Sequence, residues 1–84
     1  MGKIACVFKL MPEDADTDLD GIKDQVRDKV EAEDIGEEDV AFGLKAIKVS
    51  AITTDEKGGT DHVENQLEEV EDVQSIELEH FDKL

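Results

Sequence analysis

The apolar residues of this chain follow two spacings in turn, and their order constrains the fold more than any single motif. Every second residue is apolar over residues 4–10, which is typical of a strand with one buried face, and Pro12 is expected to end that strand. Apolar residues three and four apart then predict a helix over about residues 18–31, with Thr17 or Asp18 as its cap. The chain therefore opens with one strand and one helix.

The remaining residues repeat this alternation. The predicted elements are a short, irregular edge strand near 33–40, a strand at 44–53, a loop at 54–59, a helix that ends at Asp72 and a strand at 73–81. Asp61 and Glu64 have the spacing of a capping box, which predicts that the second helix opens at Asp61. The resulting order βαββαβ predicts the α+β class and a ferredoxin-like sandwich, with a four-stranded antiparallel sheet and both helices on one face. We expect a single domain over residues 1–84.

Composition supports a folded domain and excludes some partners. Leu, Ile, Val and Phe make up 23 of 84 residues, about 27%, which is above the roughly 20% below which a highly charged chain is expected to be disordered. The chain has 24 acidic residues against nine Lys and Arg, for a formal charge of −15. Nucleic acid is therefore not expected as a direct ligand, because a phosphate backbone is bound by clustered cations.

Few residues offer catalytic or metal-binding chemistry. The single cysteine, Cys6, lies on the apolar face of the first strand, far in sequence from His62 and His80. Neither an activated nucleophile nor a metal-ligand spacing results, so we expect no enzyme activity, no cofactor and no metal site. One cysteine fits a reducing cytosol, and no apolar run is long enough to span a membrane. A cytoplasmic protein without a membrane partner is the expectation.

One acidic motif suggests an alternative function. The letters DTDLDG at residues 16–21 match the first half of an EF-hand calcium loop. The twelfth position of such a loop needs a bidentate Glu, and here it is Arg27. The same segment is also expected to be helical, which would point its three Asp side chains in different directions. A small acidic calcium-binding or protein-interaction module therefore stays the alternative, and acidic helix capping is the favoured interpretation.

Several segments together resemble archaeal elongation factor 1-beta and the C-terminal exchange domain of its eukaryotic counterpart. They are KLMPE at 9–13, AFGLKAIK at 41–48, DEKGGTD at 55–61, VQS at 73–75 and FDKL at 81–84. Their order and spacing agree with this family over essentially the whole chain. The resemblance implies a guanine nucleotide exchange factor that binds elongation factor 1-alpha, the GTPase that delivers aminoacyl-tRNA, in its GDP-bound or nucleotide-free form.

The resemblance also implies which residues contact that partner. Phe42, with its neighbours Ala41 and Gly43, matches an aromatic position that packs into the GTPase near the nucleotide site. Lys83 matches a penultimate lysine that approaches the magnesium and phosphate region. From the pattern alone, Phe42 could equally be a core residue beneath its turn.

The charge of the chain departs from the usual pattern of this family. Such an acidic composition is similar to that of haloarchaeal proteins, in which molar salt screens self-repulsion. An acidic face that meets a basic patch on a partner is the other interpretation.

Overall fold

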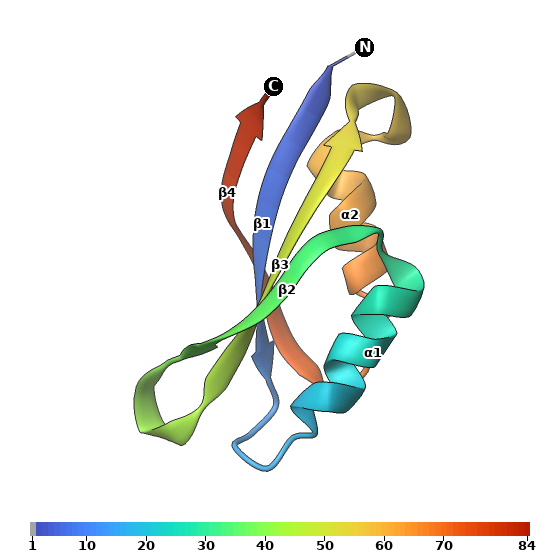
Figure 1. Cartoon of the computed structure of the whole chain (residues 1–84). Coiled ribbons are helices and arrows are strands. Elements are labelled where there is room, and N and C mark those ends of the chain that lie inside the picture. The colour runs from blue at the N-terminus through green and yellow to red at the C-terminus, as the bar shows by residue number, and fades with distance from the viewer. Residues whose placement is uncertain (1) are drawn as a thin grey trace.

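The computed structural model describes residues 2–84, and for Phe42 it describes the backbone only. Four strands and two helices alternate along the chain (Figure 1). They are β1 (Lys3–Pro12), α1 (Leu19–Lys29), β2 (Ala32–Asp39), β3 (Lys45–Thr54), α2 (Gly59–Leu67) and β4 (Val73–Lys83). Two short 3-10 turns, η1 (Ala41–Gly43) and η2 (Asp55–Lys57), lie before and after β3.

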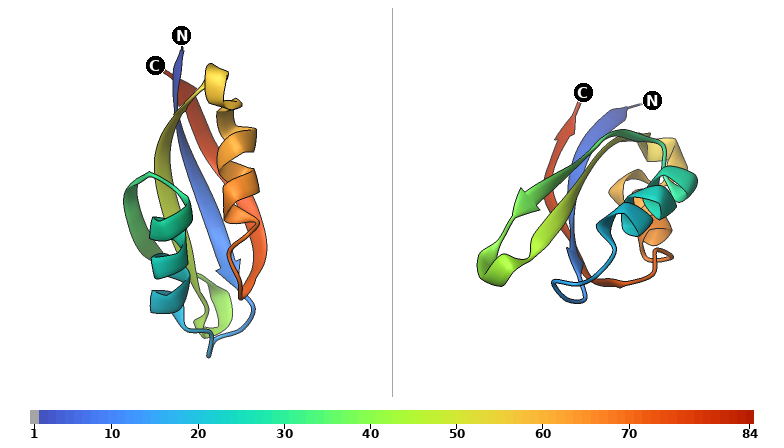
Figure 2. Two further views of the ribbon diagram at one scale, coloured as in Figure 1. Left: turned by 90° about the vertical axis from the view of Figure 1, so that its right-hand side faces the viewer. Right: turned by 60° about the horizontal axis from the view of Figure 1, so that its bottom comes forward.

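All neighbouring strands are antiparallel, in the order β2-β3-β1-β4. Both helices cover the same face of the sheet, and the other face is open (Figure 2). This arrangement confirms the predicted ferredoxin-like α+β fold. It also confirms that the acidic segment after the first helix forms an edge strand, since β2 is outermost in the sheet.

The core lies between the covered face and the helices. The even-numbered residues of β1 point into it, in the alternation that the sequence predicts, and Phe8 is fully buried. Ile22 and Val26 of α1 are buried beside them, as are Val63 and Leu67 of α2. Both helices are short, so their stability comes from burying these apolar faces rather than from helix propensity.

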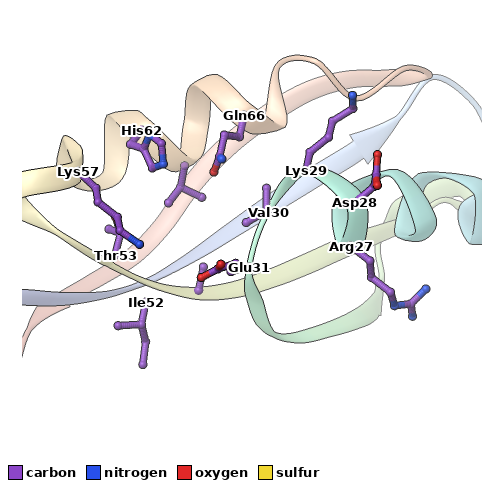
Figure 3. A pocket seen from close by; sticks show the side chains of 12 residues that line it. Arg27, Asp28, Lys29, Val30, Glu31, Ile52, Thr53, Lys57, His62 and Gln66 are labelled. Carbon is purple, nitrogen blue, oxygen red and sulfur yellow. The ribbon is translucent and has the colours of Figure 1, made fainter.

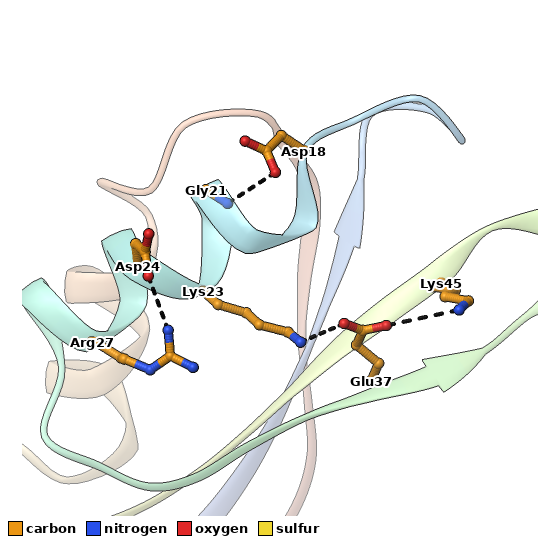
Figure 4. Close-up of polar contacts among 7 residues, drawn as sticks. All are labelled: Asp18, Gly21, Lys23, Asp24, Arg27, Glu37 and Lys45. Carbon is orange, nitrogen blue, oxygen red and sulfur yellow. Dashed lines mark hydrogen bonds and ion pairs between the residues drawn. The ribbon is translucent and has the colours of Figure 1, made fainter.

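The helix caps agree with the sequence at one helix and differ at the other. Asp18 caps α1, because its carboxylate accepts a hydrogen bond from the Gly21 backbone N–H at 3.2 Å (Figure 4). The capping box predicted at Asp61 is wrong, since α2 begins at Gly59 and its N-cap is Gly58. Gly58 has φ +106°, a left-handed conformation that glycine adopts without strain.

The predicted end of the first strand is confirmed, and that of the last strand is corrected. Pro12 is the last residue of β1 and is paired with Val73. A strand terminus tolerates proline because no further ladder bond is needed from its nitrogen. β4 continues past Phe81 to Lys83, so residues predicted to lie beyond the last strand are part of the sheet.

Candidate functional site

Lys83 is exposed, and its backbone is held in the sheet. It is the last residue of β4 and lies opposite Ile4 of β1. The next residue, Leu84, donates its backbone N–H to the Lys3 carbonyl at 2.8 Å. The ammonium group of Lys83 is therefore carried on a flexible side chain from a fixed backbone position.

A β-bulge in β4 decides which face Lys83 points to. Leu78 lies opposite Phe8, whereas His80 lies opposite Val7, so Glu79 is an extra residue in β4. Beyond this bulge Phe81 lies opposite Cys6, whose side chain points into the core. Residues directly opposite in an antiparallel pair share a face. Phe81 and, two residues later, Lys83 therefore both lie on the side of the sheet that carries the helices.

The other predicted contact is the turn between β2 and β3. Here Ala41–Gly43 forms η1, and the Val40 N–H donates to the Leu44 carbonyl at 2.9 Å, which closes the hairpin. Gly43 has φ +76°, and both Ala41 and Gly43 are exposed. The side chain of Phe42 lies outside what the structure describes, so its role as a partner contact stays a prediction.

These two predicted contacts lie at opposite ends of the sheet (Figure 1). The η1 turn ends two residues before Lys45. Lys83 and Thr53 are both paired with Ile4, so they lie at the same level of the sheet. Thr53 is eight residues beyond Lys45 along β3, which is about 26 Å at roughly 3.3 Å per residue. The longest dimension of the whole chain is 41 Å. No single pocket can receive both residues, so a partner that contacts both must follow most of the length of this molecule.

Cations at the centre of the open face are already paired. Lys9 and Lys48 lie directly opposite each other on β1 and β3, a like-charge contact that is unfavourable by itself. A carboxylate oxygen of Glu38 lies 3.5 Å from the Nζ atom of Lys48 and 4.0 Å from that of Lys9. Glu79 of β4 forms a second ion pair with Lys48. The hydrogen bond with Glu79 is the main reason that the pKa of Lys48 is raised. This network neutralises the middle of the open face.

A second group of ion pairs ties α1 to the edge of the sheet (Figure 4). Glu37 of β2 accepts a hydrogen bond from Lys23 of α1 and lies 3.9 Å from Lys45 of β3. The bond from Lys23 lowers the pKa of the Glu37 carboxyl. Within residues 2–84, Lys83 takes part in none of the ion pairs, so its charge is available to a partner.

A cavity of about 530 Å³ opens between α1, α2 and the end of β3 (Figure 3). Lys57, His62 and Gln66 line it, and so does Thr53, whose buried hydroxyl has no hydrogen-bond partner among the described residues. Glu31 also lines it, and its carboxylate would repel the anion that Lys57 attracts. The mixed charge gives this cavity no clear ligand preference.

Catalytic and metal-binding chemistry has little geometric support in the described residues. Cys6 is buried, and burial raises the pKa of its thiol, which is the opposite of what activates a nucleophile. Asp18, the central residue of the calcium-like motif, is used as a helix cap. Across residues 2–84, no three His, Cys, Asp or Glu side chains are grouped to hold a metal ion. No helix of this part of the chain has the length and apolar character needed to cross a membrane.

Comparison with known proteins gives a consistent result. Residues 5–84 match the model of the EF-1 guanine nucleotide exchange domain. Elongation factor 1-beta of Methanosphaerula palustris is 44% identical over 79 residues, and that of Methanosarcina mazei is 41% identical over 83, with 93% of both chains covered in each case. Elongation factor 1-beta of Halobacterium salinarum is 39% identical, with all of both chains covered. The chain belongs to the EF-1 guanine nucleotide exchange domain family.

Proposed function

We propose that this chain binds the GTPase elongation factor 1-alpha in its GDP-bound or nucleotide-free form and promotes the exchange of GDP for GTP. The observation that carries the proposal is the family match over residues 5–84, which includes both the η1 turn and Lys83. Such a factor makes and breaks no covalent bond, so the proposal needs no catalytic group and no cofactor. The proposed location is the cytoplasm, where translation takes place.

Lys83 is the residue we assign to nucleotide release. Magnesium and oriented hydrogen-bond donors hold the phosphates of a bound nucleotide, so a cation placed near the metal position competes with it electrostatically. Lysine suits this role because its charge is compact and its stem is flexible. Lys83 is exposed, and its backbone is fixed by pairing with β1, which gives the ammonium group a defined range of positions.

The η1 turn is the part we assign to anchoring. An aromatic side chain that becomes desolvated in a partner pocket contributes much of the free energy of binding in many complexes. Ala41 and Gly43 flank Phe42 and are small and exposed, so the backbone of the turn can approach a partner closely. In this proposal Phe42 holds the complex together while Lys83, at the other end of the sheet, acts on the nucleotide site.

Release of labelled GDP from the cognate elongation factor 1-alpha tests the function directly. The wild-type chain should accelerate release, and Lys83→Ala should reduce the exchange rate more than it reduces binding. Lys3→Ala is the matched control, because Lys3 is also exposed at this end but points to the open face. An unchanged rate with the wild-type chain contradicts the exchange function, and full activity of Lys83→Ala removes this lysine from the mechanism.

We also infer that the acidic surface is an adaptation to high salt. No acidic residue is among the buried residues of the described chain, so the charge of −15 lies at the surface, where screening is effective. The Debye length falls from about 10 Å at 0.1 M salt to about 3 Å at 1 M. The thermal midpoint should therefore rise between 0.1 and 2 M KCl. A midpoint that does not rise would contradict this inference and favour an acidic face for a basic partner.

A further inference from the structure

We infer that Phe81 is a second apolar contact of the same GTPase, presented beside Lys83 by the bulge in β4. This inference rests on the proposed function, and it adds a contact residue to the FDKL segment, in which the family resemblance assigns a role to Lys83 alone. The partner surface that fits it is an apolar patch next to a site that binds phosphate and a divalent cation.

The exposed apolar residues are unevenly distributed over the molecule. Among the described residues, the large hydrophobic side chains that are exposed are Ile52, Phe81 and Leu84, at 43%, 53% and 70%. All three lie at the end of the sheet that carries Lys83, since their β1 neighbours are Ala5, Cys6 and Lys3. Scattered exposed hydrophobic residues are ordinary. Phe81 differs from the other two because it lies on the same side of the sheet as Lys83, and an exposed aromatic ring beside a cation is typical of a binding surface.

Phe81 is exposed because the helices do not reach it. It lies on the helix-bearing side of the sheet, but α2 packs against β1 and β3. The first turn of α2 lies over Ile4, since a Cβ atom added to Gly59 would meet the Ile4 side chain at 3.7 Å. Figure 1 shows the end of β4 on the far side of β1 from α2. The ring of Phe81 therefore stands on an uncovered strip at the sheet edge.

The bulge places the aromatic ring and the cation on one side. Without the extra residue at Glu79, the alternation through Ile76 and Leu78 would put Phe81 on the open face. With it, Phe81 and Lys83 share a face and are two residues apart, or about 7 Å along the strand. A protein partner typically covers about 800 Å² of the surface that it contacts. A GTPase that receives Lys83 from this side must therefore also cover Phe81.

The acid between these two residues points away from them. Asp82 lies opposite Ala5 on the open face and is 2.8 Å from the Nε2 atom of His80. Its carboxylate therefore does not compete with the partner for Lys83. The helix-bearing side of the β4 end presents an aromatic ring and a positive charge, which matches an apolar patch beside bound phosphate.

Titration of the GTPase in its GDP form with Phe81→Ala tests the inference. We expect Kd to rise at least about tenfold, in the range of a moderate interface hot spot, and Phe81→Leu to retain most of the affinity. Ile52→Ala is the matched control, since Ile52 is similarly exposed at this end but on the open face, and it should bind as the wild type does. Thermal melting of each variant shows that it is folded at the temperature of the titration.

If Phe81→Ala does not fold, ¹⁹F NMR of the chain without a substitution at this position tests the inference instead. In the chain labelled with 4-fluorophenylalanine, the ¹⁹F resonance of Phe81 should shift on addition of the GTPase, while that of the buried Phe8 should not. Wild-type affinity of folded Phe81→Ala, an equal loss in Ile52→Ala, or an unshifted Phe81 resonance would overturn the inference. If the wild-type chain accelerates GDP release in the same experiments, the proposed function stands without it.

Discussion

The two faces of the sheet are built from the same strands but by different physical means. On the covered face Cys6, Phe8 and Leu10 are at most 1% exposed and pack beneath the two helices. On the open face the residues between them, such as Val7 and Lys9, are half-buried, and charged side chains cross the strands in ion pairs. One face holds the fold together, and the other makes the sheet compatible with water.

This difference explains where binding residues are found. The covered face is filled by the core, and the centre of the open face has its cations paired with Glu38 and Glu79. At the end of β4, by contrast, Lys83 is in none of the ion pairs of the described residues, and Phe81 is exposed beside it. The fold therefore leaves its ends available for a partner, and substitutions there should affect binding more than stability.

The largest effect is expected on the covered face. Phe8→Ala should lower the free energy of unfolding by about 3–5 kcal/mol, because it leaves a cavity in a fully buried site. Val7→Ala, one residue away on the open face, should cost about 1 kcal/mol or less. Denaturant unfolding of both variants in the same salt measures the contrast. Similar costs for the two variants would contradict the assignment of stability to one face.

A smaller effect, on binding rather than folding, is expected at the η1 end. Phe42→Ala should weaken the complex with elongation factor 1-alpha by about 2 kcal/mol, or roughly 30-fold in Kd, if the ring is an anchor. Its thermal transition should stay near that of the wild type. Calorimetric titration and thermal melting give the two values. A large drop of the melting temperature would instead show that Phe42 belongs to the core beneath its turn.

The sequence predicts the fold well because most of its signals are local. The alternation in residues 4–10 and the helical spacing in residues 18–31 both report directly which side chains are buried. The predictions are wrong where the backbone conformation, rather than the pattern of side chains, determines where an element begins. Gly58 is the N-cap of α2 and has a left-handed conformation, which no spacing of polar residues reveals, so the capping-box pattern at Asp61 is misleading.

The site is harder to predict than the fold. Lys83 and the η1 turn are indicated by resemblance to a family, since their own residue types have many possible uses. Phe81 lies in one of the segments that carry this resemblance, but the sequence does not show which face it occupies, because that depends on a bulge in which one residue of β4 has no partner opposite it. Strand alternation read from the sequence assigns it to the wrong face, and only the register with Cys6 corrects this.

The smallest expected effect concerns the ion pairs between α1 and the sheet edge. Glu37 accepts a hydrogen bond from Lys23, and this bond lowers the pKa of Glu37 below its ordinary value of 4.5. A lowered pKa in the folded state means that the ion pairs stabilise the fold above that ordinary value and lose their effect as the pH falls through the lowered pKa. Glu37→Gln should therefore be slightly less stable than the wild type at pH 7.

Glu33→Gln is the control that isolates these ion pairs from the general charge of the chain. It lies on the same strand and removes the same charge, but Glu33 has no ion-pair partner among the described residues. In low-salt buffer, where screening is weak, Glu37→Gln should melt at a lower temperature than Glu33→Gln at pH 7, and the gap should close in acid. A difference in melting temperature that does not change with pH would mean that Glu37 acts through packing rather than charge. The edge strand β2 would then be stabilised in the same way as the covered face, and not by ion pairs.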